Sequence, residues 1–305
     1  MVVLVKIVKS PGSATIINAI ATGYGSAFGI DLSIIAEARL GKPGIHCSSD
    51  LGADPKLMNI CVKNVLNHYD ISADNSLEDS ITNLDFGTGE GIEIKTESNL
   101  PLGSGLSSSS ALSNAVVKAT ASLIESNFNL KPLSDMELIN LGIESSLEAG
   151  VTITGAFDDA SASYFGGITI TDNSNRKLLA RDTLDDENIL VFMPDKESLS
   201  GSSDVSRMKL IAPLVEIAFE KARSKEYYKA LTLNGLLYGS VLNFDNNIAI
   251  EALDAGALAS GLSGTGSSFV AIAKEERIDD IKDAWAQFDG NVIETKANNE
   301  GTCFI

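Results

Sequence analysis

The stretch that decides the fold is GIEIKTESNLPLGSGLSSSSA, which occupies residues 91–111. Apolar and polar residues alternate over 91–97, and this period of two predicts a half-buried strand. A turn rich in glycine and serine follows. From about Ser109 to Glu125 small and apolar residues recur at i, i+4 spacing, which predicts a helix. The segment therefore contains a strand, a glycine-rich turn and a helix N-terminus in that order.

This order of elements is typical of an anion-binding site. Gly103 and Gly105 allow the backbone to approach an anion, and the free N–H groups and the dipole of the first helical turn favour negative charge there. The four serines at 107–110 add hydroxyl groups that can bond phosphate or ligate Mg²⁺. A flexible Gly/Ser loop is the alternative. The motifs of a Walker-type loop, a dinucleotide fold and a serine hydrolase do not occur in the sequence.

Composition limits the class of protein. The 305 residues carry 23 Lys and Arg against 41 Asp and Glu, which gives a net charge of −18. At roughly 150 residues per domain, this length predicts about two domains. The acidity argues against a nucleic-acid-binding protein and against a polybasic membrane-surface protein. No apolar stretch is long enough for a membrane span or a signal peptide, which predicts a cytoplasmic chain.

Cysteine and histidine offer little chemistry. Cys47, Cys61 and Cys303 form no closely spaced pair, so neither a disulfide framework nor a thiolate metal site is indicated. The chain has only two histidines, which nearly excludes histidine-based zinc chemistry.

Strands and helices alternate without a regular βαβ rhythm, which favours an α+β fold over a doubly wound sheet. The helix predicted at 134–147 begins with Ser134 as N-cap and has Glu137 three residues later, a capping-box pattern. The polar stretch between 172 and 188 predicts a boundary near residue 180, hence domains 1–180 and 181–305. The other predicted helices are 55–69, 206–223, 226–240, 245–256 and 277–287, and the other predicted strands are 2–8, 166–171, 189–194, 269–273 and 291–297.

Three further stretches combine small residues with polar ones. They are SPGSATIINAIATGYGSAFGID at 10–31, EAGVTITGAFDDASASYFGG at 148–167 and LSGTGSSF at 262–269. The pair Asp158–Asp159 could be a solvated turn, which is the usual place for such pairs. Its neighbours are apolar or small rather than charged, which indicates partial burial. A buried carboxylate requires a metal or proton partner, so the pair is a candidate for catalysis.

Taken together, these stretches resemble those of the GHMP kinase superfamily. Pro101–Ala111 matches the central motif P-x-x-x-G-L-G-S-S-A, with Ser107 in place of a usual Gly and Ser110 in place of a usual Ala. The runs G-x-A-T-I-x-N-A-I-A-T-G-x-G-x-A-F-G-I-D and T-G-A-F-D-D-A-x-A-S-Y-F-G-G are similar to those of the archaeal type of shikimate kinase. The match extends from about Gly12 to Phe269. It implies a two-domain fold, with an N-terminal mixed α/β domain that holds the phosphate loop and a ferredoxin-like C-terminal domain.

The resemblance implies that the central loop binds ATP and that its serines include a ligand of Mg²⁺. Ser109 would be this ligand, and Glu148, eleven residues before Asp159, would complete the metal site. Asp159 would accept the proton of the substrate hydroxyl, and Asp158 would orient it. The residues implied in ATP binding are Pro101, Gly103, Ser104, Gly105, Leu106, Ser107, Ser108, Ser109, Ser110 and Ala111.

The resemblance also implies an acceptor site. Asn18, Thr22 and Asp31 are the candidates for binding the hydroxyl groups of shikimate. Its carboxylate requires a cation, for which Arg207 is the first candidate and Lys209 the second. Both basic residues could instead lie on a solvated helix face.

Two further implications concern the stretch at 262–269, which is the third motif of the family, and the stretch at 10–31, which is the first motif. Gly264 and Gly266 would pack against the phosphate loop, beside the substrates. Ser13 stands where mevalonate kinases have a lysine after Pro-Gly, which weighs against a mevalonate kinase.

The implied activity is phosphorylation of the 3-hydroxyl of shikimate by ATP and Mg²⁺. Homoserine kinase or another small-alcohol kinase of the superfamily is the alternative enzyme, and a catalytically silent metabolite sensor is the alternative from a different class. The expected partners are ATP and shikimate, without nucleic acid or membrane, and the chain is expected to be a monomer or a homodimer.

Overall fold

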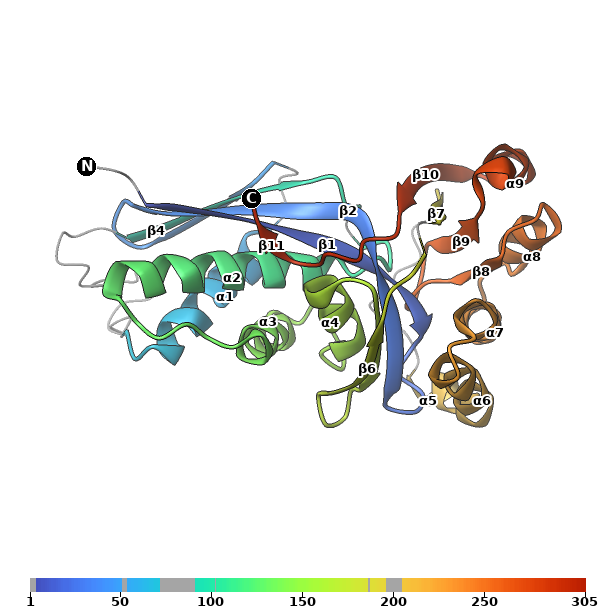
Figure 1. The fold of residues 1–305 in the computed structure, drawn as a ribbon, viewed down its shortest axis with the longest axis horizontal. Coiled ribbons are helices and arrows are strands. Elements are labelled where there is room, and N and C mark those ends of the chain that lie inside the picture. Colours follow the sequence, from blue (N-terminus) through green and yellow to red (C-terminus); the bar gives the residue numbers. More distant parts are fainter. Residues whose placement is uncertain (1–3, 51–53, 72–90, 102, 186, 196–204) are drawn as a thin grey trace.

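The computed structural model describes residues 4–50, 54–71, 91–101, 103–185, 187–195 and 205–305, which form two β-sheets (Figure 1). The first sheet has the strand order β11-β1-β2-β4-β3. In addition, β5 pairs with β2, and β6 pairs with β5. Its strands are β1 (Val5–Ile17), β2 (Tyr24–Gly41), β3 (Ile45–Ser49), β4 (Gly91–Ser98), β5 (Ile168–Asp172), β6 (Lys177–Asp182) and β11 (Cys303–Phe304). The second sheet has the order β10-β7-β9-β8, with β7 (Asn188–Pro194), β8 (Ala259–Leu262), β9 (Phe269–Ala273) and β10 (Gly290–Lys296).

Helices cover one face of the first sheet, and together they form what we call the N-terminal unit (Figure 1). These helices are α1 (Lys56–His68), α2 (Ser108–Phe128), α3 (Asp135–Ala149) and α4 (Phe157–Phe165). Helix α2 packs closely on β1 and β2 because its buried face is made of small residues such as Ala115 and Ala119. The predicted capping box of α3 is confirmed, since Ser134 and Glu137 exchange both hydrogen bonds.

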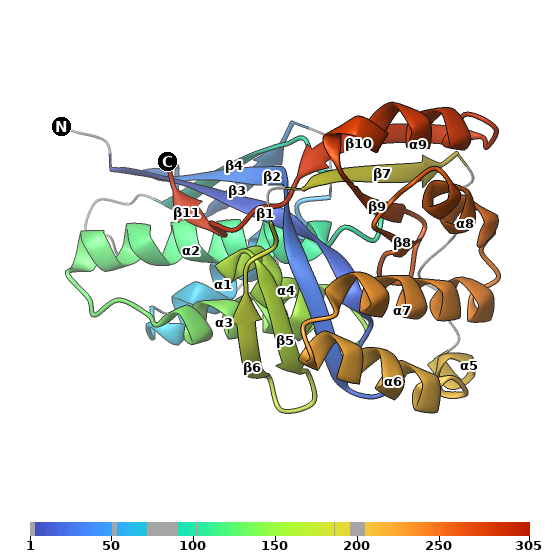
Figure 2. The same ribbon diagram turned by 45° about the vertical axis from the view of Figure 1, so that its right-hand side comes forward.

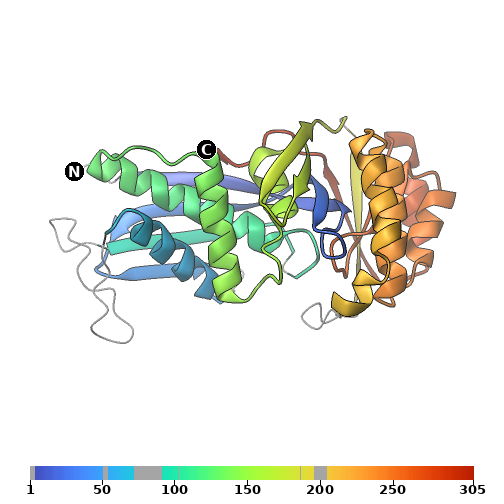
Figure 3. The ribbon, with the colours of Figure 1, turned by 90° about the horizontal axis from the view of Figure 1, so that it is seen from below.

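The second sheet and its helices form the C-terminal unit. The order β7, helices, β8, β9, helix, β10 is the β-α-β-β-α-β arrangement of a ferredoxin-like fold, as predicted, and all its strand pairs are antiparallel. Its helices are α5 (Val205–Lys209), α6 (Ala212–Arg223), α7 (Tyr227–Val241), α8 (Asn247–Asp254) and α9 (Ile278–Trp285), with a 3₁₀ turn at Glu275–Arg277. Figure 3 shows α6 and α7, in orange, on the side of this unit that faces the viewer, and both helices contact the β1–β2 hairpin.

Strands β1 and β2 form one long hairpin that reaches from the first sheet to the C-terminal unit (Figure 2). We predicted a strand at 2–8 only and assigned no element to 10–31. The pairing continues to Ile17 through register shifts after Pro11 and Thr15. Most residues in the second half of β1 are small and buried on both sides, so the alternation that identifies a half-exposed strand is absent.

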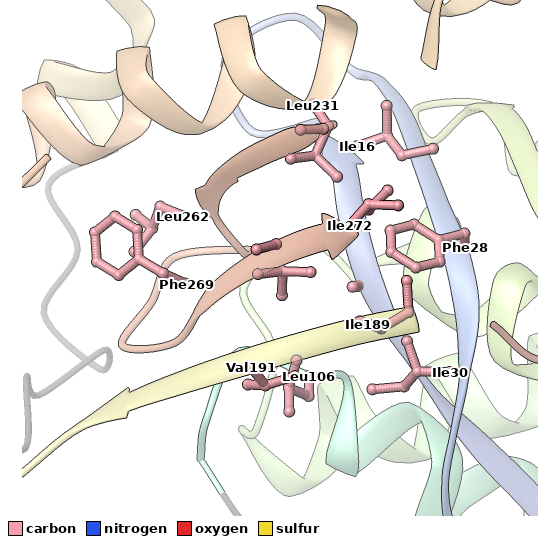
Figure 4. Packing of buried hydrophobic residues seen from close by; sticks show 14 of the residues in the cluster. Ile16, Phe28, Ile30, Leu106, Ile189, Val191, Leu231, Leu262, Phe269 and Ile272 are labelled. Atoms are coloured by element: carbon pink, nitrogen blue, oxygen red, sulfur yellow. The ribbon is translucent and has the colours of Figure 1, made fainter. Parts of the chain in front are cut away.

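One hydrophobic core joins the two units (Figure 4). Ile16 and Phe28 from the hairpin pack in the same cluster as Ile189 and Ile272 from the second sheet and Leu231 from α7. None of these side chains is more than 2% exposed. Because apolar side chains of both units pack in this one core, the two units stabilise each other. The packing also fixes the shape of the space between them.

The predicted boundary at residue 180 needs correction. It falls inside β6, which pairs with β5 of the first sheet, and the C-terminal unit begins only at β7. The end of the chain also returns to the N-terminal unit, where β11 pairs with β1 (Figure 2). The sequence contains no signal for this return because β11 pairs over only two residues.

We predict that Thr302→Val destabilises the protein without a change of shape. The Thr302 hydroxyl is buried, lies 2.8 Å from the Ser10 hydroxyl and donates to the Ser163 carbonyl at 3.0 Å, so it connects β1, α4 and the C-terminal segment. Loss of this partner should lower the free energy of unfolding by about 1–3 kcal/mol, measured by urea denaturation. The exposed Thr183→Val is the control, and equal stability of the two variants would contradict the prediction.

Candidate active site

A cavity of about 500 Å³ is lined by half of the site residues that the sequence analysis singled out, among them both aspartates of the pair and three of the four serines. Its wall is formed by the end of β1, the N-terminal ends of α1, α2 and α4, and the loops that connect α3 to α4 and β8 to β9. The described residues that line it are Thr15, Asn18, Ala19, Ile20, Asp54, Leu57, Gly103, Gly105, Ser107, Ser108, Ser109, Leu112, Gly150, Val151, Thr152, Ile153, Thr154, Ala156, Asp158, Asp159, Gly264, Thr265 and Gly266.

The phosphate loop leads directly into α2. Gly103 and Gly105 have φ values of +65° and +78°, which glycine adopts at little cost, and Ser107 is the N-cap with φ +61°. Ser107, Ser108 and Ser109 line the cavity, so the helix begins at its wall. The first N–H groups of a helix lack partners within it and carry the positive end of its dipole, which suits an anion.

Five other residues assigned to ATP binding support this loop without lining the cavity. Ser104, for example, is 2% exposed and its hydroxyl donates to the Pro101 carbonyl at 3.0 Å. The five are Pro101, Ser104, Leu106, Ser110 and Ala111, and all of them except Pro101 are buried.

The loop between β8 and β9 packs directly on the phosphate loop. The Ser263 hydroxyl donates to the Gly105 carbonyl at 2.9 Å, and the Ser268 N–H donates to the Ser104 carbonyl at 3.1 Å. A Cβ at Gly105 would lie 2.6 Å from the Ser263 carbonyl and 2.9 Å from that of Gly266. Only glycine fits there, so the predicted contact between the third motif and the phosphate loop is present in the structure.

Asp158 and Asp159 are in the first turn of α4, and both line the cavity. Asp158 Oδ1 accepts a hydrogen bond from Asn173 Nδ2 at 2.7 Å. Asp159 Oδ1 is buried and has no hydrogen-bond partner among the described residues. The first turn of a helix stabilises nearby carboxylates through its dipole, which partly offsets the burial of the pair.

Burial raises the pKa of the Asp159 carboxyl well above its usual range. The charge of Asp158 raises that pKa further, whereas the hydroxyls of Ser107 and Ser13 lower it. Burial also raises the pKa of Asp158, and the hydrogen bond from Asn173 opposes this. A cation or a hydroxyl donor beside Asp159 would favour its charged form.

Asn18 joins the first motif to the third. Its side-chain Nδ2 donates to the Gly264 carbonyl at 2.9 Å, and its backbone N–H donates to Asn234 Oδ1 of α7 at 3.2 Å. The Tyr238 hydroxyl donates to the Asn18 carbonyl and accepts from the Ala21 N–H, both at 3.1 Å. The turn after β1 is thus held by the C-terminal unit.

Three predicted residues lie outside the cavity. Thr22 Oγ1 bonds within its own turn, to the backbone of Tyr24. Asp31 points to the side of β2 opposite its buried neighbours and pairs with Lys9 at 3.0 Å. Glu148 is exposed, accepts from Asn64 Nδ2 of α1 at 3.3 Å and does not line the cavity, whereas Ser109 does.

The two predicted cations are on α5, at the side of the C-terminal unit. Arg207 Nη2 donates to Asn243 Oδ1 at 3.3 Å. The next residue, Phe244, has its ring directly against Gly266, so Arg207 is close to the cavity but does not line it. Lys209 is exposed and does not line it either.

The cavity also contains residues that the sequence analysis did not select. Val151 and Ile153 are 49% and 54% exposed, which is unusual for large apolar side chains, and they form part of the wall. Asp54 and Thr265 line it as well. Thr265 lies between Gly264 and Gly266, which the sequence analysis did select, so its place between them could have identified it as a cavity residue.

The described part of the lining has three carboxyl groups and no lysine or arginine. An anionic ligand in this cavity must therefore bind to backbone N–H groups, hydroxyls and a bound cation rather than to basic side chains of the described wall.

Two family models match the chain. The model of the GHMP kinases N-terminal domain matches residues 72–167, and the model of the GHMP kinases C-terminal domain matches residues 216–291. The chain belongs to the GHMP kinase family. The second match lies within the C-terminal unit, and the first one ends at the paired glycines after α4.

Relatives of this GHMP kinase include two proteins named shikimate kinase. That of Methanobrevibacter smithii is 57% identical over 98% of this chain and 99% of its own length, and that of Methanothermobacter thermautotrophicus is 50% identical over 99% of each. Among solved structures, the Methanococcus jannaschii mevalonate kinase has a TM-score of 0.72 at 16% identity, covering 95% of this chain and 98% of that one. The Cytophaga hutchinsonii homoserine kinase has a TM-score of 0.68 at 18% identity, covering 99% and 97%. These structures share the fold.

Two further features concern the described residues of this kinase. No helix among them is both long and apolar enough to cross a membrane. In the same part of the chain, no three His, Cys, Asp or Glu side chains gather in a group that could hold a metal ion.

We predict that Asp159→Asn stabilises this kinase at neutral pH. The variant removes a carboxyl group whose burial raises its pKa, and such a group costs on the order of 1–3 kcal/mol when it must be ionised without partners. A group whose pKa is higher in the folded state than in the unfolded state contributes fully to stability at pH values below its unfolded-state pKa. This contribution to the free energy of unfolding is lost as the pH rises through the folded-state pKa. The advantage of the variant should therefore grow with pH, measured by denaturation between pH 4 and 8.

Denaturation of Asp172→Asn is the control, since Asp172 is half-buried outside the cavity and its pKa is lowered by hydrogen bonds from Asn175. An Asp159→Asn variant less stable than the parent at pH 8 would contradict the prediction.

Proposed function

We propose that this chain is a shikimate kinase, which transfers the γ-phosphoryl group of ATP to the 3-hydroxyl of shikimate. The observation that carries the proposal is the position of Asp159 beside Ser13 and Ser107. Asp159 is the proton acceptor, and it lines the same cavity as the N-terminus of α2. The names of the relatives at 57% and 50% identity support the choice of acceptor.

In this mechanism the chain positions two ligands and accepts one proton. The N-terminal turn of α2 and the phosphate loop hold the phosphates, and the acceptor binds beside them, next to Asn18 and the third motif, which adjoins the phosphate loop. The acceptor oxygen bonds to the γ-phosphorus, and the bond to the bridging oxygen breaks with its electron pair remaining on ADP. The hydroxyl proton passes to the Asp159 carboxylate.

The lining of the cavity fits Mg²⁺ as the companion of ATP. Its donors are oxygen atoms, which this hard cation prefers, and its three carboxyl groups add negative charge where a polyphosphate must bind. The Ser109 hydroxyl, at the start of α2, is the group that would hold the cation together with phosphate oxygens. Mg²⁺ supplies charge neutralisation to the transferred phosphoryl group when it is bound.

The acceptor carboxylate requires a cation from outside the described wall. Arg207 fits this role because Asn243, which it contacts, precedes Phe244, and the Phe244 ring packs on Gly266 of the cavity. A small movement of a long arginine side chain would bring its guanidinium to the rim, where a bidentate pair with a carboxylate could form.

We predict that Arg207→Met raises the KM for shikimate by about 10- to 100-fold, the loss expected for one charge-assisted pair, and leaves the KM for ATP within about twofold. Steady-state kinetics with each substrate varied would measure the split. Arg223→Met is the matched control, because Arg223 pairs with Glu220 on α6 outside the cavity. Equal rises in both KM values would contradict the carboxylate role.

The decisive experiment is an acceptor panel in a coupled assay of ADP release with Mg²⁺. We expect shikimate to be the preferred acceptor over homoserine, mevalonate and galactose, and we expect Asp159→Asn to lower kcat by about 10²- to 10⁴-fold. Preference for homoserine would replace the proposed acceptor. ATP binding without turnover of any acceptor would instead indicate a metabolite sensor.

A further inference from the structure

The serine that begins α2 does not cap its helix. Ser107 is the N-cap residue, and the side chain of an N-cap serine usually accepts a hydrogen bond from an N–H group of the first turn. The Ser107 hydroxyl accepts no such bond. Its backbone has φ +61°, a conformation that costs glycine little but strains a residue with a side chain. A strained serine that leaves its helix uncapped indicates another use for the hydroxyl.

The Ser107 hydroxyl is held by Ser13 of β1 instead. Ser13 Oγ donates to Ser107 Oγ at 2.7 Å, and Ser107 Oγ donates to the Ser13 carbonyl at 3.3 Å. The Ser13 N–H also donates to the Leu106 carbonyl at 3.2 Å. Ser13 is fully buried and Ser107 is 9% exposed. Three hydrogen bonds therefore fix β1 against the start of α2, and two of them involve the Ser107 hydroxyl.

Both hydroxyls lie beside the Asp159 carboxyl group. Ser13 uses its one hydroxyl proton in the short bond to Ser107. The bond from Ser107 to the Ser13 carbonyl is long for a hydroxyl donor, whose usual range is about 2.5–3.0 Å. An ionised carboxylate is a stronger acceptor than a carbonyl, so the Ser107 proton turns to Asp159 when that group is charged. In such a chain, the bond from Ser13 strengthens the one that Ser107 donates.

A phosphate of ATP is the other acceptor that the Ser107 hydroxyl could serve, since Ser107 lines the cavity. Ser108 and Ser109 line the cavity as well. The hydroxyls of these two serines make no hydrogen bond to another described residue, whereas the Ser107 hydroxyl is engaged with Ser13. Hydroxyls for the phosphates are therefore available at Ser108 and Ser109 without that of Ser107.

We propose that Ser13 and Ser107 are positioning residues for Asp159: Ser13 holds the Ser107 hydroxyl, and this hydroxyl orients the proton acceptor rather than binding the phosphates of ATP. The pair also ties Asp159 to the start of α2, where the phosphates bind. The inference rests on the proposed function, in which Asp159 accepts the proton, and deepens it by giving a residue of the phosphate loop a different role.

The first test separates turnover from nucleotide binding. Ser13→Ala should lower kcat by about 10-fold, and Ser107→Ala, which removes the hydroxyl next to the carboxylate, should lower it by about 10- to 100-fold. Both variants should keep the affinity for a non-hydrolysable ATP analogue within about twofold of the parent. Steady-state kinetics and calorimetric titration measure the two quantities. A tenfold weaker affinity for the analogue in Ser107→Ala would assign its hydroxyl to the phosphates and overturn the proposal.

Ser10→Ala is the matched control. Ser10 is on the same strand, is as fully buried as Ser13 and does not line the cavity. Its hydroxyl lies 3.1 Å from that of Ser163 and 2.8 Å from that of Thr302. The variant should be less stable but keep kcat within about twofold. A loss of kcat as large as that of Ser13→Ala would show that any buried serine of β1 has this effect, and the positioning role would be wrong.

A double-mutant cycle shows whether Ser13 acts through Asp159. In the Asp159→Asn background no carboxylate is left to orient, so the addition of Ser13→Ala should lower the residual kcat by less than about twofold. A tenfold loss in both backgrounds would contradict the proposal. If Ser13→Ala does not fold, Ser107→Ala takes its place in the cycle, with the same two outcomes.

The outcomes also separate this inference from the proposed function. If the parent phosphorylates shikimate and the cycle shows no coupling, only the positioning role is wrong. If the parent prefers homoserine, only the identity of the acceptor is wrong, and the cycle is run with homoserine. If Asp159→Asn keeps the kcat of the parent, the assigned proton acceptor is wrong and the positioning role with it. If no acceptor is phosphorylated, the proposed function and this inference are both wrong.

Discussion

The direct contact between the phosphate loop and the β8–β9 loop is the constraint on which the rest of this structure depends. Carbonyl oxygens of Ser263 and Gly266 approach Gly105 so closely that no side chain could stand between them. The contact joins the start of α2, in the N-terminal unit, to the C-terminal unit, and Asn18 reinforces it through its bond to Gly264. This approach places Gly264, Thr265 and Gly266 in the wall of the cavity, next to the N-terminus of α2.

The cavity also shows how an acidic protein can handle anions. With a net charge of −18, the chain as a whole repels nucleotides, and the described lining adds carboxyl groups rather than cations. An anion in this cavity would meet the N-terminus of α2 and hydroxyl groups, which act within a few ångströms, and the proposed function adds a divalent cation to them. The buried aspartates of α4 are costly to ionise, which is typical of groups retained for chemistry rather than for stability.

Much of the local structure was predictable because its determinants are contiguous. The capping box at Ser134, the strand at 91–97 and the glycine-rich turn each depend on residues within one short segment. The long β1–β2 hairpin was missed, since its second half is buried on both faces and lacks alternation. The return of β11 to β1 was missed because a pair of two residues leaves no pattern in the sequence.

The sequence by itself determined which chemistry is available: a phosphate loop, an aspartate pair and a third glycine-rich turn, each recognisable because its residues adjoin. Only the tertiary structure decided which side chains meet. Glu148 has the predicted spacing from Asp159, but it shares the face of α3 with Ser145, and both contact Asn64 of α1. Asp31 is exposed because a strand turns successive side chains to opposite sides. Spacing along a chain counts residues, whereas a site depends on the direction in which each side chain points.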